Sequence, residues 1–456
     1  MRNFIEYHKN KRMKLKFLTF LLMLVVSSQV FGQDNGTNIK FVEYDLDNGL
    51  HVILHEDHTT PIVTVSIMYH VGSKNENPDK TGFAHFFEHL LFEGSENIKR
   101  GEFDNYVENA GGTLNANTSF DRTYYYEILP SNQLELGLWL ESERLLHAKV
   151  EDIGIETQRQ VVKEERRQRI DNQPYGSVLE QTMSHLFTEH PYKWPIIGSM
   201  AHLDAAVEKD YVDFYKTFYV PNNAVLSIAG DINPAEAKVM IEKYFGTIPR
   251  GTKEIPRPTI KEPALTAEVR DTVWDNIQLP GVIQGFRIPA QGTDDYYAVD
   301  MLATLLSRGE SSRFNKKLVD ELELALFVGT FPLDLEDEGV ALTYGIANMT
   351  TDAQDLEDAM DKMYAEVRNE LVTEREFQKL RNQVESDFIQ SNATMAGIAE
   401  SLANYHMYFG NADLINNELE RYRSVTREDI KRVANKYFIT TNRTTLHYLP
   451  KGQKGN

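Results

Sequence analysis

Two segments that lie almost half the chain apart share one pattern, and this repetition constrains the fold more than any other feature. Residues 210–223 (DYVDFYKTFYVPNN) align without gaps on residues 429–442 (DIKRVANKYFITTN), 219 positions later in a chain of 456 residues. Both segments read as an amphipathic helix that runs into a strand. A second pair, LLFEG at 90–94 and LLSRG at 305–309, is separated by 215 positions. Two such similar spacings indicate two homologous halves, because a solenoid would repeat every ~20–50 residues.

A proline-rich segment divides the two halves. Residues 249–266 contain four prolines and no hydrophobic periodicity, which is typical of a linker between domains. The chain is also too long for one ordinary core, since about 150 residues per domain is usual. We therefore predict an N-terminal domain at 37–250, a linker at 251–266 and a homologous C-terminal domain at 267–450.

The periodicity within each half mixes strands and helices. Alternating apolar and polar residues predict strands at 50–54, 63–70 and 123–129, and longer segments at 132–146 and 356–369 predict helices. Antiparallel pairing between strands that follow one another in the chain, with helices gathered on one side of the sheet, is typical of the α+β class. We predict two homologous α/β sandwiches, each an antiparallel-rich sheet with helices packed on one face.

The stretch HFFEH at residues 85–89 has the spacing of a catalytic metal site. Residues four apart share one face of a helix, so His85 and His89 can reach the same ion. Glu88 lies on that side and can reach a water molecule instead of the metal. The order H-x-x-E-H is that of the inverzincin zinc hydrolases. The alternative is a buried helix whose histidines only pack among apolar residues, but each buried polar group would then need another partner.

A third metal ligand should exist elsewhere, because a catalytic zinc ion usually binds three protein side chains and leaves its fourth position to water. Residues 155–170 (IETQRQVVKEERRQRI) are strong helix formers without Gly or Pro. Glu164 and Glu165 lie near the middle of this segment. On residue type alone, the pair also fits a solvated charged turn before two arginines.

Four segments resemble the pitrilysin/insulinase family of zinc metallopeptidases. They are TGFAHFFEHLLFEGS at 81–95, GGTLNANTSFDRTYYY at 111–126, VVKEERRQRIDNQPYG at 161–176 and FYVPNNAVLSIAGDI at 218–232. The resemblance is strongest to the branch that includes the mitochondrial processing peptidases and their short bacterial relatives. It implies two homologous domains that form half of a clamshell, Zn²⁺ as the cofactor and peptide hydrolysis as the reaction.

The resemblance also implies a role for individual residues of the metal site. His85, His89 and Glu165, which lies 76 positions beyond His89, would bind the zinc ion. Glu164, its immediate neighbour, is the second choice. Glu88 would act as the general base on a zinc-bound water.

Two further positions follow from the resemblance. Asn115 and Ala116 match an Asn-Ala pair that lies on a strand edge near the metal, where an extended peptide can be held by main-chain hydrogen bonds. Many relatives carry a second glutamate seven positions before the third ligand, where this chain has Gln158. A glutamine there can still donate or accept a hydrogen bond that orients the site.

The second half keeps the helix of the repeat but lacks the metal set. On the shift of 215 positions, the three polar residues of HFFEH fall opposite Asp300, Ala303 and Thr304. Only the first half is therefore expected to bind zinc. In the family, the second half closes over the substrate.

A departure from the family pattern concerns residues that bind the substrate. Active relatives often supply an Arg and a Tyr seven positions apart, from the second half or from a partner subunit. In the matching stretch LVDELELAL at 318–326, Val319 and Leu326 stand at those places. Arg313 is nearby, and we expect it to have a structural role. The chain is thus predicted to be the zinc-bearing subunit of a two-chain enzyme whose zinc-less homologous partner supplies the Arg/Tyr pair, with a homodimer as the second choice.

Taken with the motifs, these departures leave three functional hypotheses. The first is an exported zinc metalloendopeptidase that hydrolyses unstructured peptides or small polypeptides. The second is a non-catalytic structural subunit of a larger complex, although such subunits typically lose the metal ligands that this chain retains. The third is a peptide-binding module with vestigial catalysis, which the Val319 and Leu326 departures favour.

The N-terminus predicts export. Basic residues precede the apolar run FLTFLLMLVV at 17–26, and neutral residues follow it up to Gly32, which is the pattern of a signal peptide over residues 1–32. The apolar run is too short to be a comfortable membrane span, so we expect removal, with an uncleaved anchor as the alternative. A cysteine-free exported chain suits a bacterial periplasm or secretion.

The charge of the chain excludes some partners. The formal net charge of −20 becomes −25 when residues 1–32, with six basic and one acidic side chain, are removed. Such a negative field disfavours nucleic acid and anionic membranes and attracts basic peptides. Charge that serves solubility alone is the other explanation.

Overall fold

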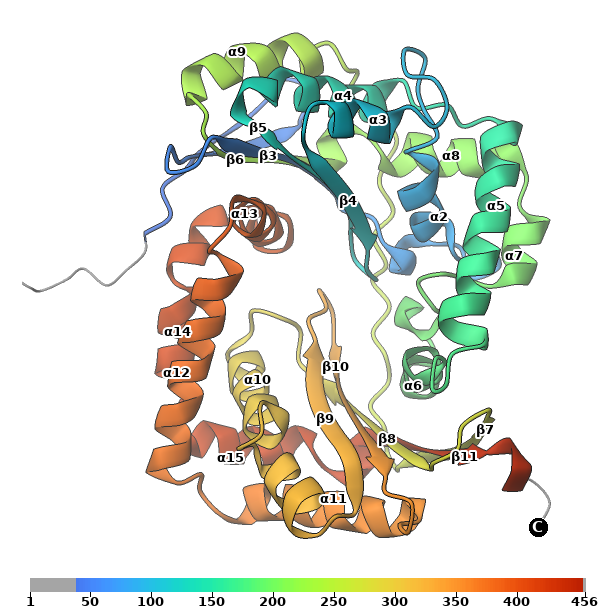
Figure 1. Ribbon diagram of the computed structural model, residues 1–456, viewed down its shortest axis with the longest axis vertical. Coiled ribbons are helices and arrows are strands. Elements are labelled where there is room, and N and C mark those ends of the chain that lie inside the picture. The colour runs from blue at the N-terminus through green and yellow to red at the C-terminus, as the bar shows by residue number, and fades with distance from the viewer. Residues whose placement is uncertain (1–37, 454–456) are drawn as a thin grey trace, which may run out of the picture. The chain divides into compact units, whose positions relative to one another are not determined.

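The computed structural model describes residues 38–453, which contain two β-sheets (Figure 1). The first sheet has six strands in the order β1-β2-β6-β3-β5-β4, and the second has five in the order β7-β11-β8-β10-β9. Most neighbouring strands are antiparallel, but β2 with β6 and β7 with β11 are parallel pairs. The predicted class of two α/β halves is thus confirmed.

The first half of the chain forms the six-stranded sheet. Its strands are β1 Val42–Asp45, β2 His51–Glu56, β3 Ile62–Tyr69, β4 Thr113–Thr118, β5 Thr123–Pro130 and β6 Ala224–Gly230. Its helices are α2 Phe83–Leu90, α3 Phe103–Asn109, α4 Leu134–Leu146, α5 Asp152–Arg166, α6 Val178–Leu186, α7 Met200–Ala205, α8 Glu208–Phe218 and α9 Pro234–Phe245. Among the described residues, no helix or strand lies between α9 and β7, the range in which the sequence predicts the linker.

The second half forms the five-stranded sheet. Its strands are β7 Val269–Asp275, β8 Gly281–Ile288, β9 Ala325–Leu333, β10 Gly339–Ala347 and β11 Arg443–Pro450. Its helices are α10 Asp294–Ser307, α11 Ala353–Asn369, α12 Glu374–Ser391, α13 Met395–Phe409, α14 Glu418–Ser424 and α15 Arg427–Tyr437. The repeat is visible in the fold, because α8 leads through a short 3₁₀ turn into β6 just as α15 leads into β11.

Each sheet is covered on its second face by a helix from the other half of the chain. Helices α4 and α9 lie on one face of the first sheet, and α13 packs against β2, β3 and β6 from the opposite side (Figure 1). In the second sheet, Val282 and Phe286 of β8 join the core formed with α10 and α11, whereas Ile283 joins Val178 of α6. The sequence predicts only the helices of each half on their own sheet, so this exchange of α6 and α13 is an addition to the predicted fold.

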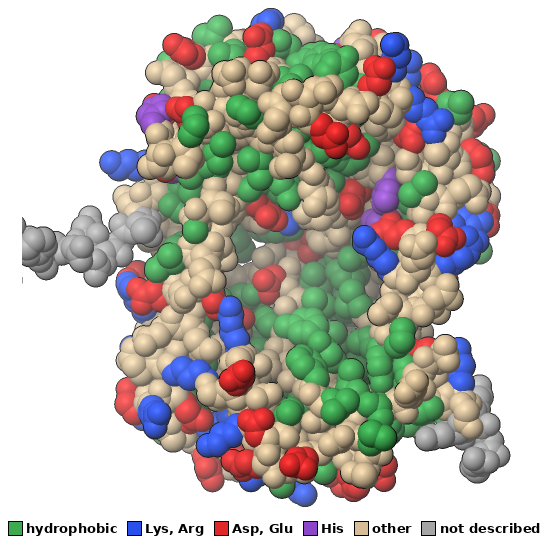
Figure 2. Space-filling view, viewed as in Figure 1, with side chains coloured by type: hydrophobic (Ala, Val, Ile, Leu, Met, Phe, Trp, Pro, Cys, Tyr) green, Lys and Arg blue, Asp and Glu red, His purple; other side chains and the backbone are tan. Residues whose placement is uncertain are grey.

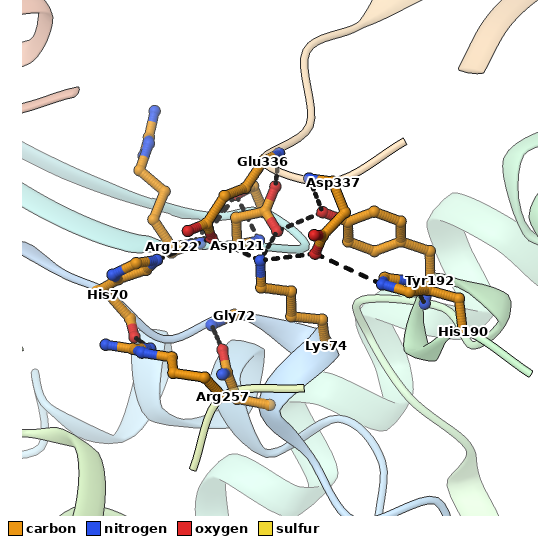
Figure 3. A network of polar contacts seen from close by, with 12 residues as sticks. His70, Gly72, Lys74, Asp121, Arg122, His190, Tyr192, Arg257, Glu336 and Asp337 are labelled. Atoms are coloured by element: carbon orange, nitrogen blue, oxygen red, sulfur yellow. Dashed lines mark hydrogen bonds and ion pairs between the residues drawn. The ribbon is translucent and has the colours of Figure 1, made fainter. Parts of the chain in front are cut away.

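A buried network around Lys74 also connects the halves (Figure 3). The Lys74 ammonium lies 2.8 Å from Asp121 Oδ1, 2.5 Å from Glu336 Oε2 and 3.3 Å from Asp337 Oδ2. Glu336 Oε2 lies 2.8 Å from His70 Nε2 as well. Because Lys74 is only 3% exposed, its charge depends on these carboxylates for stabilisation. The loop after β9 is thereby held against the first half.

Glu336 should make the protein less stable in acid. Burial raises the pKa of Glu336, but the hydrogen bond with His70 and the charge of Lys74 outweigh it and lower that pKa from 4.5 to about 2. An acid with a lowered pKa stabilises the fold fully above pH 4.5 and loses that contribution as the pH falls toward 2. The shift corresponds to at most about 3 kcal/mol.

We therefore expect Glu336→Gln to lower the free energy of unfolding at pH 7 and to flatten its fall between pH 4.5 and 2. Urea unfolding at a series of pH values measures both effects. The exposed neighbour Glu338 supplies the control, because Glu338→Gln should leave the profile unchanged. Superimposable profiles for the two variants would contradict the role of Glu336.

The segment before the first sheet carries the predicted signal peptide. Residues 1–32 lie outside the described residues, so this assignment stays a prediction. Within residues 38–453, no helix is both long and apolar enough to cross a membrane.

Candidate metal centre

Helix α2 carries the HFFEH motif, and its surroundings explain why a helix begins there. Gly82 precedes it with a φ of 96°, a conformation that favours glycine. The Glu76 carboxylate accepts hydrogen bonds from the N–H groups of Gly82 (2.7 Å) and Ala84 (2.8 Å), which stabilises the positive end of the helix dipole. Phe86 and Phe87 are fully buried and anchor the core face of the helix. The polar residues of the motif are thus directed away from the core.

Arg144 of α4 fixes the other end of α2. Its guanidinium is fully buried and donates hydrogen bonds to the carbonyl of Leu91 and to Glu141, each at 3.1 Å. The rings of Phe92 and Tyr125 lie 4.5 and 4.1 Å from it, in the geometry of cation–π contacts. Sequence reasoning missed this residue, because nothing in its local pattern distinguishes it from a surface arginine.

His85, His89 and Glu165 converge on one point. Glu165 Oε2 lies 3.5 Å from His85 Nε2 and 3.1 Å from His89 Nε2, and one ligand atom of each residue lies within 4.8 Å of the others. The two imidazole rings have centroids 4.9 Å apart and planes inclined by 68°. Ligand atoms around a tetrahedral zinc ion are ~3.3 Å apart, so two imidazoles and a carboxylate at these distances fit zinc.

The side chains of Glu165 and its neighbour Glu164 have different surroundings in the structure. Glu164 accepts hydrogen bonds from Arg167 and Gln168, both at 3.1 Å, and 54% of its side chain is exposed. Glu165 faces α2, with 15% of its side chain exposed, and its second oxygen lies 2.8 Å from Arg169 Nη1. The geometry therefore favours Glu165 as the third ligand. Sequence reasoning missed Arg169, although its position four residues after Glu165 was a usable signal.

Burial controls protonation at this centre. Burial and the adjacent His89 lower the pKa of His85 to about 4, so its imidazole is neutral at neutral pH and can bind a metal. The neighbouring His89 lowers the pKa of Glu165, which keeps that carboxylate ionised. Burial raises the pKa of Glu88, which makes it a stronger base than an exposed glutamate. Neutral imidazoles and one carboxylate are ligands that zinc prefers.

Asn115 and Ala116 border the same hollow as Glu88 and His89. They belong to β4, an edge strand that among the described residues pairs only with β5. An edge strand leaves the N–H and C=O groups of its outer side available to another chain. The structure thus brings the predicted substrate-binding residues beside the metal candidates.

Gln158 of α5 also borders this hollow. Its Nε2 donates a hydrogen bond of 2.6 Å to Glu93 Oε1, just beyond the end of α2. The side chain therefore ties α5 to the segment that follows the motif helix. Glu93 is a contact that sequence reasoning did not identify.

A second group, Glu43, His51 and His406, also brings possible ligand atoms within 4.8 Å of one another. The two imidazoles, however, are stacked with centroids 3.3 Å apart and planes inclined by only 10°. The lone pairs of parallel rings lie in parallel planes and cannot both point at one ion. This contrast favours the centre on α2 as the metal site.

Comparison with known proteins identifies the family. The family described as insulinase (peptidase family M16) matches residues 51–199, and the peptidase M16 inactive domain matches residues 208–384. Zinc protease PqqE of Helicobacter pylori is 33% identical over 418 residues, which cover 89% of this chain and 92% of the relative. The chain belongs to the M16 insulinase family of peptidases.

Two further similarities support this M16 assignment. A crystal structure of a protease from Helicobacter pylori matches with a TM-score of 0.87 and 31% identity, over 90% of this chain and 100% of the other. The probable mitochondrial-processing peptidase subunit beta of Arabidopsis thaliana is 25% identical over 404 residues, 86% of this chain and 75% of the relative. The predicted family and enzyme class are therefore confirmed.

Proposed function

We propose that this M16 peptidase is an exported zinc endopeptidase that hydrolyses unstructured peptides or small polypeptides. The observation that carries the proposal is the convergence of His85, His89 and Glu165 beside Glu88. All four residues are partly buried, and Glu88 and His89 border the open hollow beside β4, where a substrate can reach them. The name of PqqE as a zinc protease supports zinc as the metal.

The side chains of the centre divide the chemistry among them. A zinc ion held by His85, His89 and Glu165 would supply Lewis acidity to the scissile carbonyl and to the attacking water. Glu88 is placed to accept the proton of that water, since it adjoins His89 and has a raised pKa. The water oxygen joins the carbonyl carbon, the C–N bond breaks, and the protonated Glu88 returns the proton to the leaving amine.

An extended peptide is the substrate that this surface fits. A peptide paired with the outer side of β4 would be held by main-chain hydrogen bonds next to Asn115 and Ala116, with little sequence selectivity. Figure 2 shows hydrophobic side chains gathered over β9 and β10. These include Leu326 (55% exposed), Phe327 (45%) and Phe331 (40%). Exposed apolar surface of this kind suits the apolar side chains of an unfolded peptide.

The missing Arg/Tyr pair supports a two-chain enzyme. Val319 is half-buried against the second core, and Leu326 is exposed on β9, so neither offers a polar group to the substrate. Arg313 is engaged in a two-pronged ion pair with Glu376, at 2.9 and 3.1 Å, which agrees with a structural role. We infer that a zinc-less homologous chain supplies the pair, and this arrangement is supported by the similarity to the Arabidopsis relative, which is named as one subunit of a processing peptidase.

The proposed location is the bacterial periplasm or the secreted fraction. It rests on the basic and apolar pattern of residues 1–32 and on the absence of cysteine.

A peptide-binding module without catalysis is the second candidate function, and the residues at positions 319 and 326 favour it. Hydrolysis separates the two.

The test is cleavage of a mixed library of unstructured peptides by the chain without residues 1–32. Without its partner the chain should show only weak activity, which should vanish after treatment with a chelator and return with Zn²⁺. If the chain lacks the Arg/Tyr pair that binds the substrate, the double substitution Val319→Arg and Leu326→Tyr should raise kcat/KM. The zinc content should stay unchanged. Full activity of the unmodified chain as a homodimer would refute the two-chain arrangement. If the zinc-loaded chain with both substitutions still cleaves no peptide, the result would favour the peptide-binding module.

A further inference from the structure

A second cavity adjoins the metal centre, next to other ligands than the open hollow beside β4. The hollow borders Glu88 and His89, whereas this cavity borders His85 and Glu165, so the candidate ligands separate the two spaces. The volume of the cavity is about 290 Å³, just below the ~300–1,000 Å³ usual for the sites of whole ligands. Such a space suits one amino-acid residue better than a longer segment of peptide.

The walls of this cavity are mostly hydrophobic, and we call it the apolar cavity. They come from the turn after α5, from α6, and from two further turns of the first half. The apolar side chains include Phe120, Ile170, Leu179, Met183, Ile196 and Ile197. These walls favour an apolar side chain of the substrate, because burial there removes its surface from water.

Arg169 is the only arginine or lysine in the lining of the apolar cavity within residues 38–453. With 77% of its side chain exposed, it lies at the rim and not among the apolar walls. Its Nη1 lies 2.8 Å from Glu165 Oε1, and no other ion pair involves it in the described part of the chain. A guanidinium has five N–H donors, so most of them remain available to a ligand.

The charge at this rim favours an anion, although the whole chain is acidic. Glu180, the other acid of the lining besides Glu165, accepts hydrogen bonds from Arg166 at 3.0 and 3.3 Å and is thereby neutralised. A divalent ion, Glu88, Glu165 and Arg169 together leave a net charge of about +1. The net charge of −20 of the chain would instead repel anions. A preference for an anionic group would therefore come from the rim and not from the general charge of the protein.

A free peptide C-terminus combines what the rim and the walls require. Its carboxylate matches a guanidinium in charge and in planar shape, and its last side chain can enter the apolar space. The carboxyl carbon lies three bonds beyond the scissile carbon of the last peptide bond, which is less than ~4.3 Å. Because Arg169 contacts the ligand Glu165 directly, its N–H groups are within reach of a carboxylate so close to the metal centre. A cationic N-terminus would be repelled at this rim.

We propose that the apolar cavity binds the last residue of a peptide, with its carboxylate on Arg169, so that the enzyme also removes single C-terminal residues. This inference rests on the peptidase function proposed above. The rest of the peptide would lie in the hollow beside β4. Water adds to the carbonyl carbon of the last peptide bond, the C–N bond breaks, and the proton that Glu88 has accepted passes to the leaving amine. The products are a peptide one residue shorter and a free apolar amino acid.

The first measurement is binding without hydrolysis. Zinc-loaded Glu88→Gln chain is titrated with fluorescent peptides that end in leucine and differ only in a free carboxylate or a carboxamide at the C-terminus. We expect the free acid to bind about tenfold tighter, as for hydrogen bonds between charged groups. Arg169→Gln should remove this preference and leave the affinity for the amide unchanged. Replacing the last leucine by glycine should weaken binding of the free acid about tenfold, because the apolar side chain is lost.

Arg167→Gln is the matched control. Arg167 lies two positions before Arg169, donates a hydrogen bond of 3.1 Å to Glu164 and does not line the cavity. This variant should keep the preference for the free acid. Arg169→Lys, which keeps the charge without the planar fork, should retain part of it. All titrations are made at saturating Zn²⁺ with the zinc content measured, because Arg169 contacts a metal ligand.

The second measurement is analysis of the products by mass spectrometry. The chain with Glu88 intact should release leucine from the free acid and not from the amide. Arg169→Gln should slow this release about tenfold and leave cleavage of internal bonds unchanged.

The outcomes distinguish this inference from the peptidase function. Equal affinity for acid and amide, or no binding of either, would overturn the proposal. A preference that persists in Arg169→Gln, or that is lost equally in Arg167→Gln, would overturn it as well. Internal cleavage of both peptides without release of the last leucine would do the same and leave the peptidase function standing. The expected binding pattern without hydrolysis of any peptide would refute the peptidase function, whereas recognition of the C-terminus would stand.

Discussion

Glu88→Gln should lower kcat by about 10²–10⁴-fold, the usual contribution of a positioned general base. The amide keeps the size and hydrogen-bonding shape of the carboxylate but cannot accept the proton of the attacking water. Glu88 is absent from the group of converging ligand atoms, which consists of His85, His89 and Glu165. Zinc should therefore remain at about one ion per chain, and KM should change little.

Initial rates on a fluorogenic peptide, together with zinc content by atomic emission, measure this effect. Glu164→Gln is the matched control, because Glu164 has the same chemistry but points to solvent, where it accepts hydrogen bonds from Arg167 and Gln168. It should retain native turnover. Undiminished hydrolysis by Glu88→Gln would remove Glu88 from the catalytic role.

Glu165→Ala should release the zinc ion, whereas Glu164→Ala should not. Glu165 Oε2 lies 3.1 and 3.5 Å from the two histidine nitrogens, and Glu164 contacts neither histidine. Because groups that merely orient a ligand contribute ~10–100-fold to metal affinity, loss of a ligand should weaken zinc binding by more than ~100-fold. His85→Ala provides the reference for a chain that has lost a ligand.

Competition with a chromophoric chelator gives the zinc affinity of each variant without any need for turnover. Circular dichroism should show that both alanine variants keep the fold, since neither glutamate lies in the core. Should Glu164→Ala lose the metal and Glu165→Ala keep it, the assignment of the third ligand would have to be exchanged. Equal loss in both would indicate that the end of α5, not one carboxylate, is what the ion requires.

Local patterns predicted much of this protein, because helices, strands and the HFFEH face depend on short-range periodicity. The repeat of α8 and α15 was visible for the same reason. The choice between Glu164 and Glu165 needed the family resemblance, since adjacent residues of a helix point about 100° apart and only the position of α2 decides which one faces it. The fold now supplies that position.

The features that sequence reasoning missed depend on contacts between distant segments. The pattern of α13 shows that it has an apolar face but not that this face covers β2, β3 and β6. A cavity lined by Tyr297 of α10, Tyr405 of α13 and Tyr422 of α14 is likewise assembled from segments far apart in the chain, and no single segment carries its signature. Arg144 likewise owes its burial to α2 and to aromatic residues far away in the sequence.

The exchange of α6 and α13 has a consequence for how the chain acquires its structure during synthesis. The first sheet is complete once β6 has emerged from the ribosome, yet the face that α13 covers stays uncovered until residues of the second half have been made. A nascent first half therefore exposes Ile53, Met68 and Val225 of this face, and transiently exposed apolar surface of this kind promotes aggregation. Cutting the gene at the linker should accordingly yield two fragments that are insoluble when made separately and soluble when made together.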